Sequence, residues 1–216
     1  MPVRTPEASV RDALAALRDA LQRCRECPLG YFATQAVAGE GALRPALMLV
    51  GEVPGDQEDL QGHPFVGPAG QLLFRATDSL GWPREALFVT NAVKHFKFEL
   101  RGKRRIHKTP SQREAAACLH WLEEEIRLVE ADAAVALGAT AARSLMGRTV
   151  AVTRERGRWL RREDGLRVLV ALHPSALLRT RGEEREVAYR QWLGDLRRAD
   201  EVVAAWTRRR GSPDKT

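Results

Sequence analysis

Four short runs of apolar residues stand out along the chain. They cover residues 46–50, 87–89, 133–137 and 168–172. Continuous apolar runs of this length, rich in Val, Leu and Ala, are typical of strands that are buried on both faces of a sheet. The pattern therefore predicts four strands with helices on either side of them.

Between and around these runs, hydrophobic residues recur at helical spacing. Val10, Leu14, Leu17 and Leu21 predict a first helix, which starts at a capping Thr5. Further helices are expected over residues 68–80, 111–129, 139–147 and 183–206. Strands that alternate with helices favour an α/β fold with three layers, α/β/α, around a central, mainly parallel four-stranded sheet.

The remaining segments are less regular. Residues 150–167 are expected to form an extra hairpin or loop, because Arg162-Glu163-Asp164-Gly165 has the composition of a turn. We expect one domain over residues 1–206 and a disordered basic tail over residues 207–216.

Charge narrows the class of partner. The formal net charge is +7 and the sequence pI is about 9.9, which favours nucleic acid, although an Arg-rich composition also arises from genomic bias. No run approaches the roughly 18 apolar residues of a membrane helix, and the N-terminus lacks the apolar core of a signal peptide. We therefore expect a cytoplasmic monomer with no membrane association.

One stretch, RGKRRIHK at residues 101–108, concentrates this charge around a single histidine, His107. Taken alone, it is explained by a solvated surface loop. Its basic residues are Arg101, Lys103, Arg104, Arg105 and Lys108.

Polar residues follow the predicted strands. Glu52 and Asp56 follow the first strand, Asn91 the second, and His173 the fourth. Ligands of open parallel sheets bind beyond the carboxyl ends of the strands. We therefore expect these side chains to converge with His107 on one crevice.

Three cysteines suggest a metal site. Cys24 and Cys27 form a CxxC pair, and Cys118 is a third thiol in a predicted helix. His95 is the preferred fourth ligand, because it lies just beyond the second strand. Zinc and an iron–sulfur cluster both suit these ligands. Reduced thiols without a metal remain the alternative.

Four motifs in order resemble one family. GEVPGDQEDLQGHPFVGPAGQLL, FVTNAVK, VALGATAA and HPSALLR are similar to segments of the iron–sulfur uracil-DNA glycosylases of the family-four group. The inserted segment RGKRRIHKTPS resembles the UdgX branch of that group. The likeness runs from Cys24 to about Arg179. It implies a [4Fe–4S] cluster, with His95 where other relatives have a third cysteine.

The resemblance also implies residues that bind uracil in DNA. Single strands are the expected substrate, because no wedge that could replace a base pair is evident in the sequence. Phe65 would stack on the base and Asn91 would read its edge. His173 would donate a hydrogen bond to the uracil oxygen that gains charge. Gly51 and Val53 belong to the same motif, although Val53 replaces the Gln expected in this branch, so that only its backbone N–H is left to serve. Without the resemblance, a core Phe and a capping Asn explain Phe65 and Asn91 equally well, and a turn histidine before Pro174 explains His173 better.

In the UdgX branch, the loop histidine adds to C1′ of the sugar after uracil leaves, and the protein stays bound to DNA. The resemblance gives this role to His107. Glu52 would accept the imidazole proton or orient the ring, and Asp56 is counted with the catalytic residues. The basic residues of the stretch would hold phosphates, and Arg105 would also brace His107. Two alternatives stay open: a glycosylase that turns over normally, and a non-catalytic metal-stabilised DNA-binding module.

Overall fold

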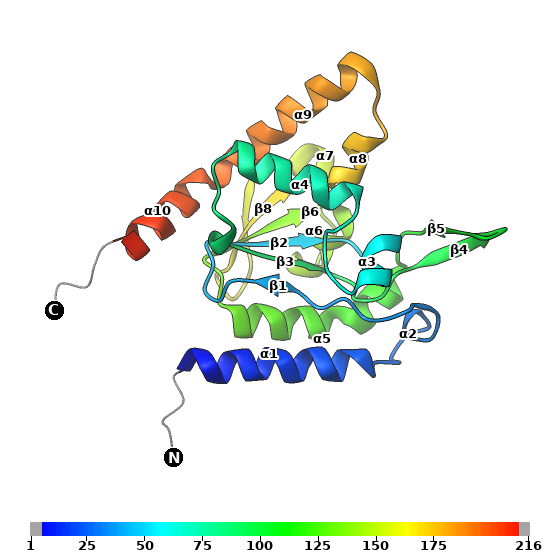
Figure 1. Cartoon of the computed structure of the whole chain (residues 1–216). Helices are drawn as coiled ribbons and strands as arrows, with labels where there is room; N and C mark the ends of the chain where they lie inside the picture. Colours follow the sequence, from blue (N-terminus) through cyan, green and yellow to red (C-terminus); the bar gives the residue numbers. More distant parts are fainter. Residues whose placement is uncertain (1–5, 212–216) are drawn as a thin grey trace.

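The computed structural model describes residues 6–211 of the chain (Figure 1). Its helices are α1 (Pro6–Gln22), α2 (Leu29–Phe32), α3 (Asp56–Gln61), α4 (Pro68–Ser79), η1 (Arg84–Ala86), α5 (Gln112–Val129), α6 (Ala139–Met146), α7 (Val152–Glu155), α8 (Pro174–Leu178), α9 (Gly182–Leu196), η2 (Arg197–Ala199) and α10 (Asp200–Gly211). Its strands are β1 (Glu40–Gly41), β2 (Leu47–Gly51), β3 (Leu87–Asn91), β4 (Phe98–Arg101), β5 (Arg104–His107), β6 (Ala133–Leu137), β7 (Trp159–Arg161) and β8 (Arg167–Ala171).

The central sheet confirms the predicted fold class. Within the described residues it has six strands in the order β1-β3-β2-β6-β8-β7. The four predicted strands, β2, β3, β6 and β8, are parallel and form its centre. The short strands β1 and β7 pair antiparallel at the two edges and extend the four-stranded sheet that the sequence predicted.

Alternate residues of β2 face two separate cores. Leu47 and Leu49 pack with apolar residues of α4, α9 and α10, whereas Met48 and Val50 pack with residues of α5 and α6. Figure 1 shows α4 and α9 above the sheet and α5 below it. Burial on both faces explains why the strands read as continuous apolar runs.

The C-terminal prediction is partly wrong. The expected helix over residues 183–206 is interrupted by η2, and α10 continues to Gly211, so residues 207–211 are helical. Thr207 Oγ1 donates to the carbonyl of Val203 at 2.9 Å, and the basic residues that follow are favourable at a helix C-terminus. The rest of the predicted tail, residues 212–216, and the predicted cap Thr5 lie outside the described residues.

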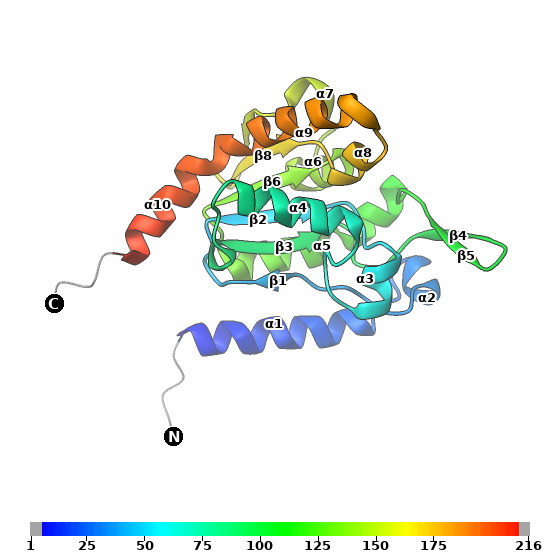
Figure 2. The ribbon, with the colours of Figure 1, turned by 45° about the horizontal axis from the view of Figure 1, so that its top comes forward.

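The basic stretch is a β-hairpin, not a loop. β4 and β5 pair antiparallel, with Phe98 opposite His107, and Gly102 takes a φ of 59° in the turn. The run of cations hides the strand pattern, because this hairpin projects from the domain and has little apolar face to bury (Figures 1 and 2). The predicted turn at residues 162–165 is confirmed: it joins β7 to β8, and the Gly165 amide donates to the carbonyl of Arg162 at 3.1 Å.

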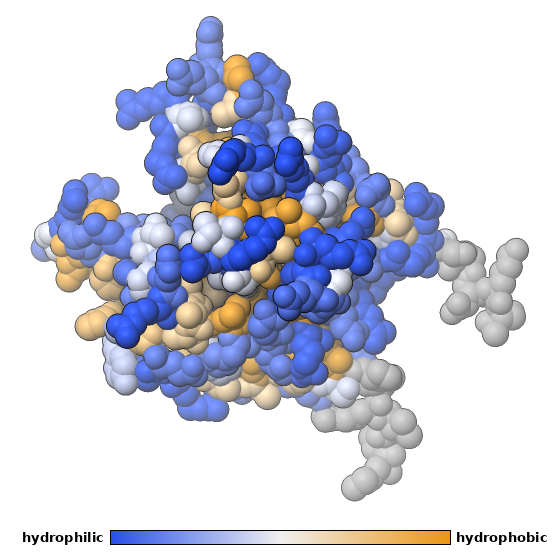
Figure 3. All heavy atoms as spheres, turned by 180° about the vertical axis from the view of Figure 1, so that it is seen from behind, coloured by the Kyte–Doolittle hydropathy of each residue, from blue (hydrophilic) through white to orange (hydrophobic). Residues whose placement is uncertain are grey.

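The surface is largely hydrophilic. Figure 3 shows the back of the molecule, where hydrophilic residues dominate and apolar groups gather in the hollow at its centre. None of the described helices is long and apolar enough to cross a membrane.

Candidate active site

The carboxyl ends of β2 and β3 bring an aromatic ring and a carboxamide together. Gly51 lies opposite Asn91 in the sheet register. A Cβ atom added to Gly51 would lie 2.3 Å from Asn91 Oδ1 and 2.7 Å from the Cζ atom of Phe65. Gly51 therefore leaves the space that lets these side chains meet. No other described residue hydrogen-bonds the Asn91 carboxamide, so its donor and acceptor are open to a ligand.

Phe65 is held in a strained backbone conformation. Its φ is 60°, which is unusual for a residue other than glycine and often marks a functional site. Glu58 fixes the surrounding loop, because its carboxylate accepts the amides of Gly55 at 3.1 Å and Gly67 at 2.8 Å. The sequence analysis missed Glu58. The one feature that could have indicated its role is its position between Gly55 and Gly67, whose amides it accepts.

His173 caps α8 and has a defined tautomer. The Ser175 amide donates to His173 Nδ1 at 3.2 Å, so the hydrogen-bond network assigns the ring proton to Nε2. Burial, followed by the nearby His107 and Arg179, lowers the pKa of His173 from 6.5 to about 4. At neutral pH His173 therefore presents an uncharged N–H donor from Nε2.

His107 comes to the same place from β5. It is exposed at the base of the hairpin, with its ring centroid 6.2 Å from that of Phe96. Its electrostatic effect on His173 indicates that the two histidines share one site. The structure thus brings His107, His173 and Asn91 to the carboxyl ends of the strands, as the sequence predicted.

Arg105 points inward and ties the hairpin to α3. Its guanidinium lies 2.6 Å from Asp56 Oδ1 and 2.6 Å from Asp59 Oδ2. The same group stacks over Phe96 and Phe98, at 5.3 and 5.2 Å from the ring centroids. The prediction that Arg105 holds a phosphate is therefore corrected, because two carboxylates occupy it. Asp56, predicted as catalytic, binds the hairpin in this arrangement.

The other cations of the stretch remain available to varying degrees. Arg101, Lys103 and Arg104 are exposed. Lys108 is half-exposed and pairs with Glu99 at 2.5 Å. Lys103 and Arg104 at the tip of the hairpin have no ion pair within residues 6–211, whereas Arg101 lies 3.9 Å from Glu99 and the base of the hairpin is fixed by ion pairs.

Two predicted residues have other contacts. Glu52 accepts a hydrogen bond from Thr140 Oγ1 at 2.8 Å, and no hydrogen bond joins Glu52 with His107 within residues 6–211. The Val53 side chain is buried in an apolar cluster with Cys118. Only the backbone of Val53 is left to act on a ligand, as expected for a residue without the polar end of Gln.

The four predicted metal ligands lie in one region. Cys27 packs with Cys118 in one apolar cluster, and Cys24 packs in the adjoining cluster with Ala36. Ala36 forms a β-bridge with His95. Across residues 6–211, no three His, Cys, Asp or Glu side chains are close enough to ligate a single metal ion. Ligands of a cluster bind separate iron atoms and need not share one coordination sphere.

The surroundings of these ligands fit a sulfur-containing group. Trp121 touches both clusters, and its Nε1 is the one buried side-chain N or O atom without a partner in the described part of the chain. A backbone N–H, that of Lys94, already donates to Cys118 Sγ at 3.3 Å. Burial and Arg25 lower the pKa of His95 to about 4, which keeps the imidazole in its neutral, ligating form.

A buried ion pair supports this region from behind. Lys94 Nζ lies 2.6 Å from Glu125 Oε2 and 2.7 Å from Thr90 Oγ1, and both charged side chains are almost wholly buried. Glu125 also accepts the Gly39 amide at 2.7 Å. The sequence analysis missed this pair, although Lys94 follows the apolar residues Ala92 and Val93, which was an indication of burial.

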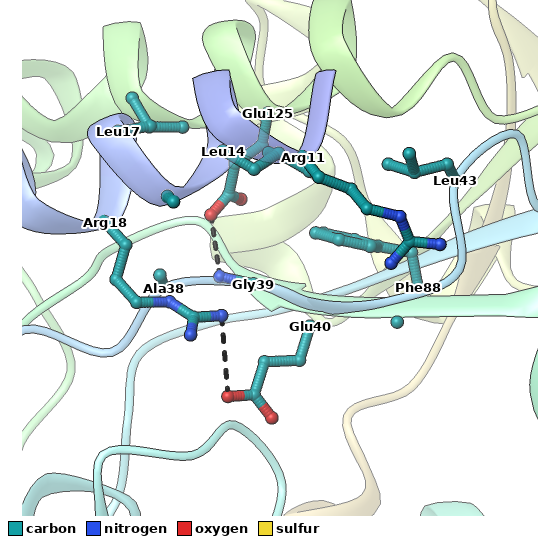
Figure 4. A pocket seen from close by; sticks show the side chains of 12 residues that line it. Arg11, Leu14, Leu17, Arg18, Ala38, Gly39, Glu40, Leu43, Phe88 and Glu125 are labelled. Atoms are coloured by element: carbon teal, nitrogen blue, oxygen red, sulfur yellow. Dashed lines mark hydrogen bonds and ion pairs between the residues drawn. The ribbon is translucent and has the colours of Figure 1, made fainter. Parts of the chain in front are cut away.

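A cavity of about 350 Å³ lies elsewhere, between α1 and the sheet edge at β1 (Figure 4). Arg18 and Glu40 form an ion pair at its rim, at 3.8 Å. None of the predicted site residues lines it. The candidate active site is therefore the cluster at the strand ends and not this cavity.

The chain is similar to known DNA repair enzymes. The family model described as the uracil DNA glycosylase superfamily matches residues 38–197. A type-4 uracil-DNA glycosylase of Thermotoga maritima is 39% identical over 165 residues, which cover 76% of this chain and 82% of that protein. One of Sulfurisphaera tokodaii is 34% identical over 175 residues, which cover 77% of this chain and 76% of that protein.

Proposed function

This chain belongs to the uracil-DNA glycosylase superfamily, and on that premise we propose that it excises uracil from DNA and is then linked covalently to the DNA through His107. The observation that carries the proposal is an exposed histidine at the base of a hairpin that the Arg105 ion pairs fix to α3. The printed names of the relatives support uracil in DNA as the substrate.

Excision breaks the bond between C1′ of the sugar and N1 of uracil. The base is first extruded from any stack and lies against Phe65, while the Asn91 carboxamide pairs with its edge. The bonding electrons leave with uracil, whose oxygen gains negative charge. His173 Nε2–H donates to that oxygen, and a neutral donor of this kind stabilises the anion without first transferring a proton.

Capture then replaces hydrolysis. The unprotonated nitrogen of His107 bonds to C1′, the other ring nitrogen loses its proton, and uracil gains one, so no water is consumed. Glu52 is the proposed proton acceptor, held by Thr140. Arg105, Asp56 and Asp59 hold the hairpin so that His107 reaches C1′.

We propose that Cys24, Cys27, His95 and Cys118 hold a [4Fe–4S] cluster. When bound, this group supplies structural stability and DNA orientation, since excision is redox-neutral. Two N–H groups suit its sulfur atoms: the Lys94 amide, which donates to Cys118 Sγ, and the unpartnered Trp121 indole. The chemistry of the donor set, thiolates with a neutral imidazole, supports iron–sulfur as well as it supports zinc. The resemblance to the iron–sulfur branch of the family is what favours the cluster.

A second candidate is a glycosylase that releases an abasic product and turns over. The likeness to the type-4 relatives favours it, because their names state excision and no capture. The two candidates differ at His107, which only capture requires.

The test is a denaturing gel of the protein with a short single-stranded oligonucleotide that contains one uracil, beside His107→Ala. A band of protein-linked DNA that survives heat and detergent and disappears in the variant is the expected result. Abasic product without this band would establish the turnover enzyme instead. If neither product forms, the protein is a DNA-binding module and not a glycosylase.

A further inference from the structure

Three large apolar side chains are exposed on α2 and α3, and we call them the α2–α3 apolar surface: Tyr31, Phe32 and Leu60. They are 68%, 72% and 58% exposed. Exposed aromatic groups of this size are unfavourable in water unless a partner covers them. Such a patch next to a candidate active site therefore points to a binding surface.

Hydrogen bonds hold the segment after α2 against α3. The Thr34 amide donates to Asp59 Oδ1 at 3.0 Å, and Gln35 Nε2 donates to the carbonyl of Leu60 at 3.1 Å. These bonds fix the segment directly after Phe32 to the end of α3. The side chains are therefore presented by a braced segment, which lowers the entropy lost when a partner binds.

The surface adjoins the hairpin that carries His107. Arg105 Nη1 donates to Thr34 Oγ1 at 3.2 Å while it pairs with Asp59 at 2.6 Å. Figures 1 and 2 both show α2 and α3 beside the base of the β4–β5 hairpin. A DNA strand that enters the site at His107 consequently has the α2–α3 apolar surface next to it.

The charge around the surface suits a nucleic acid. The exposed Arg25 guanidinium lies 5.9 Å from the Tyr31 ring centroid. Its hydrogen bonds go to the backbone carbonyls of Gln22 and Cys24, and no carboxylate within residues 6–211 pairs with it. Aromatic rings that stack on bases, beside cations that reach phosphates, are the usual means of binding single strands. An apolar protein partner would instead desolvate Arg25 without compensation.

We propose that Tyr31 and Phe32 stack on unpaired bases of single-stranded DNA that flank the target nucleotide. The inference rests on the proposed function, since it takes DNA as the substrate. Leu60 borders the same stack. Duplex bases are already stacked on each other and offer these rings no free face, so the surface favours single strands over duplex.

The test measures the affinity of the full chain for a fluorescent single-stranded oligonucleotide without uracil, so that covalent capture does not intervene. We expect a Tyr31→Ser/Phe32→Ser double variant to bind on the order of 10-fold more weakly. The slope of affinity against salt stays unchanged, because the phosphate contacts are intact. Val187→Ser, which removes an apolar group that is 44% exposed on α9, is the control and binds as the original protein does.

A second oligonucleotide, whose bases are replaced by abasic spacers, separates stacking from other effects. The original protein should lose affinity for it by the same factor, and the double variant should lose none. The inference is overturned if the original protein and the double variant bind the base-containing strand with equal affinity. It is also overturned if the double substitution weakens binding to both oligonucleotides by the same factor. A dimer that dissociates in the double variant would also overturn it, because a second copy would then cover the surface.

Excision of uracil at saturating DNA is measured in parallel. If the original protein excises uracil but the double variant binds the base-containing strand as tightly as the original protein does, the stacking surface is wrong and the proposed function stands. If the original protein does not excise uracil, the proposed function fails whatever the binding shows.

Discussion

Arg105 and Asp59 form an ion pair of 2.6 Å between Nη1 and Oδ2, and the Asp59 side chain is wholly buried. Asp59 also accepts the Thr34 amide, at 3.0 and 3.2 Å to its two oxygens. A buried carboxylate with these partners keeps a fixed position, so Arg105 is anchored to α3 rather than to solvent. The geometry of His107, two residues further along β5, therefore depends on this pair.

Weakening this anchor should reduce covalent capture more than excision. Arg105→Lys keeps the charge but loses the two-pronged contact with Asp56 and Asp59 and the flat face over the phenylalanines. A displacement of His107 by about 1 Å would slow capture on the order of 100-fold. The rate of the protein–DNA band on a denaturing gel measures it. Arg104→Lys, an exposed neighbour, is the control, and equal loss in both variants would contradict the role of the anchor.

Filling the space at Gly51 should close the base pocket. In Gly51→Ala the new methyl group would meet Asn91 Oδ1 at 2.3 Å, so the ring of Phe65 and the carboxamide have to separate. We expect the single-turnover rate constant for uracil excision to fall about 100-fold. Gly194→Ala is the matched control, because nothing lies within 4 Å of its new Cβ and it should stabilise α9 by about 0.5–1 kcal/mol. Normal excision by Gly51→Ala would rule out this pocket.

Stability should fall in mild acid through His173. Its pKa is lowered from 6.5 to about 4 in the folded protein, so between these values the unfolded chain binds the proton more readily. The free energy of unfolding should then decrease as pH falls from about 6.5 to about 4, by about 3 kcal/mol from this group. Urea unfolding at several pH values measures the slope. His173→Gln should lack this part of it, and an unchanged slope would contradict the assignment.

Removing the indole N–H of Trp121 should change the electronic properties of the proposed cluster. Trp121→Phe keeps an aromatic ring in place but removes the donor, and a sulfur without its hydrogen bond makes reduction less favourable. The midpoint potential should shift to more negative values in a spectroelectrochemical titration of the loaded protein. Trp206→Phe, whose N–H donates to the carbonyl of Arg44 at 2.8 Å, is the control and should leave the potential unchanged. Equal potentials in all three proteins would exclude Trp121 as a donor.

Several parts of the candidate site could be predicted from the sequence, because they depend on local patterns of apolar and polar residues. Asn91 is the last residue of β3 and His173 lies two residues after β8, and parallel strands end at one edge of a sheet. The proposed metal ligands rest on a CxxC spacing and the need for a further donor, and they stay a prediction. The β4–β5 hairpin could not be predicted in this way, because its run of cations hides the alternation of apolar and polar residues that is typical of a strand.

The sequence by itself determined the four central strands, their burial on both faces and the edge at which polar residues gather. Short-range sterics and the periodicity of apolar residues decide these features. Only the tertiary structure decided that Arg105 turns inward to Asp59, that Glu58 braces Phe65 and that the Trp121 N–H is left without a partner. These contacts depend on how separate elements pack together, and the residue pattern within one element does not specify which distant element it will pack against.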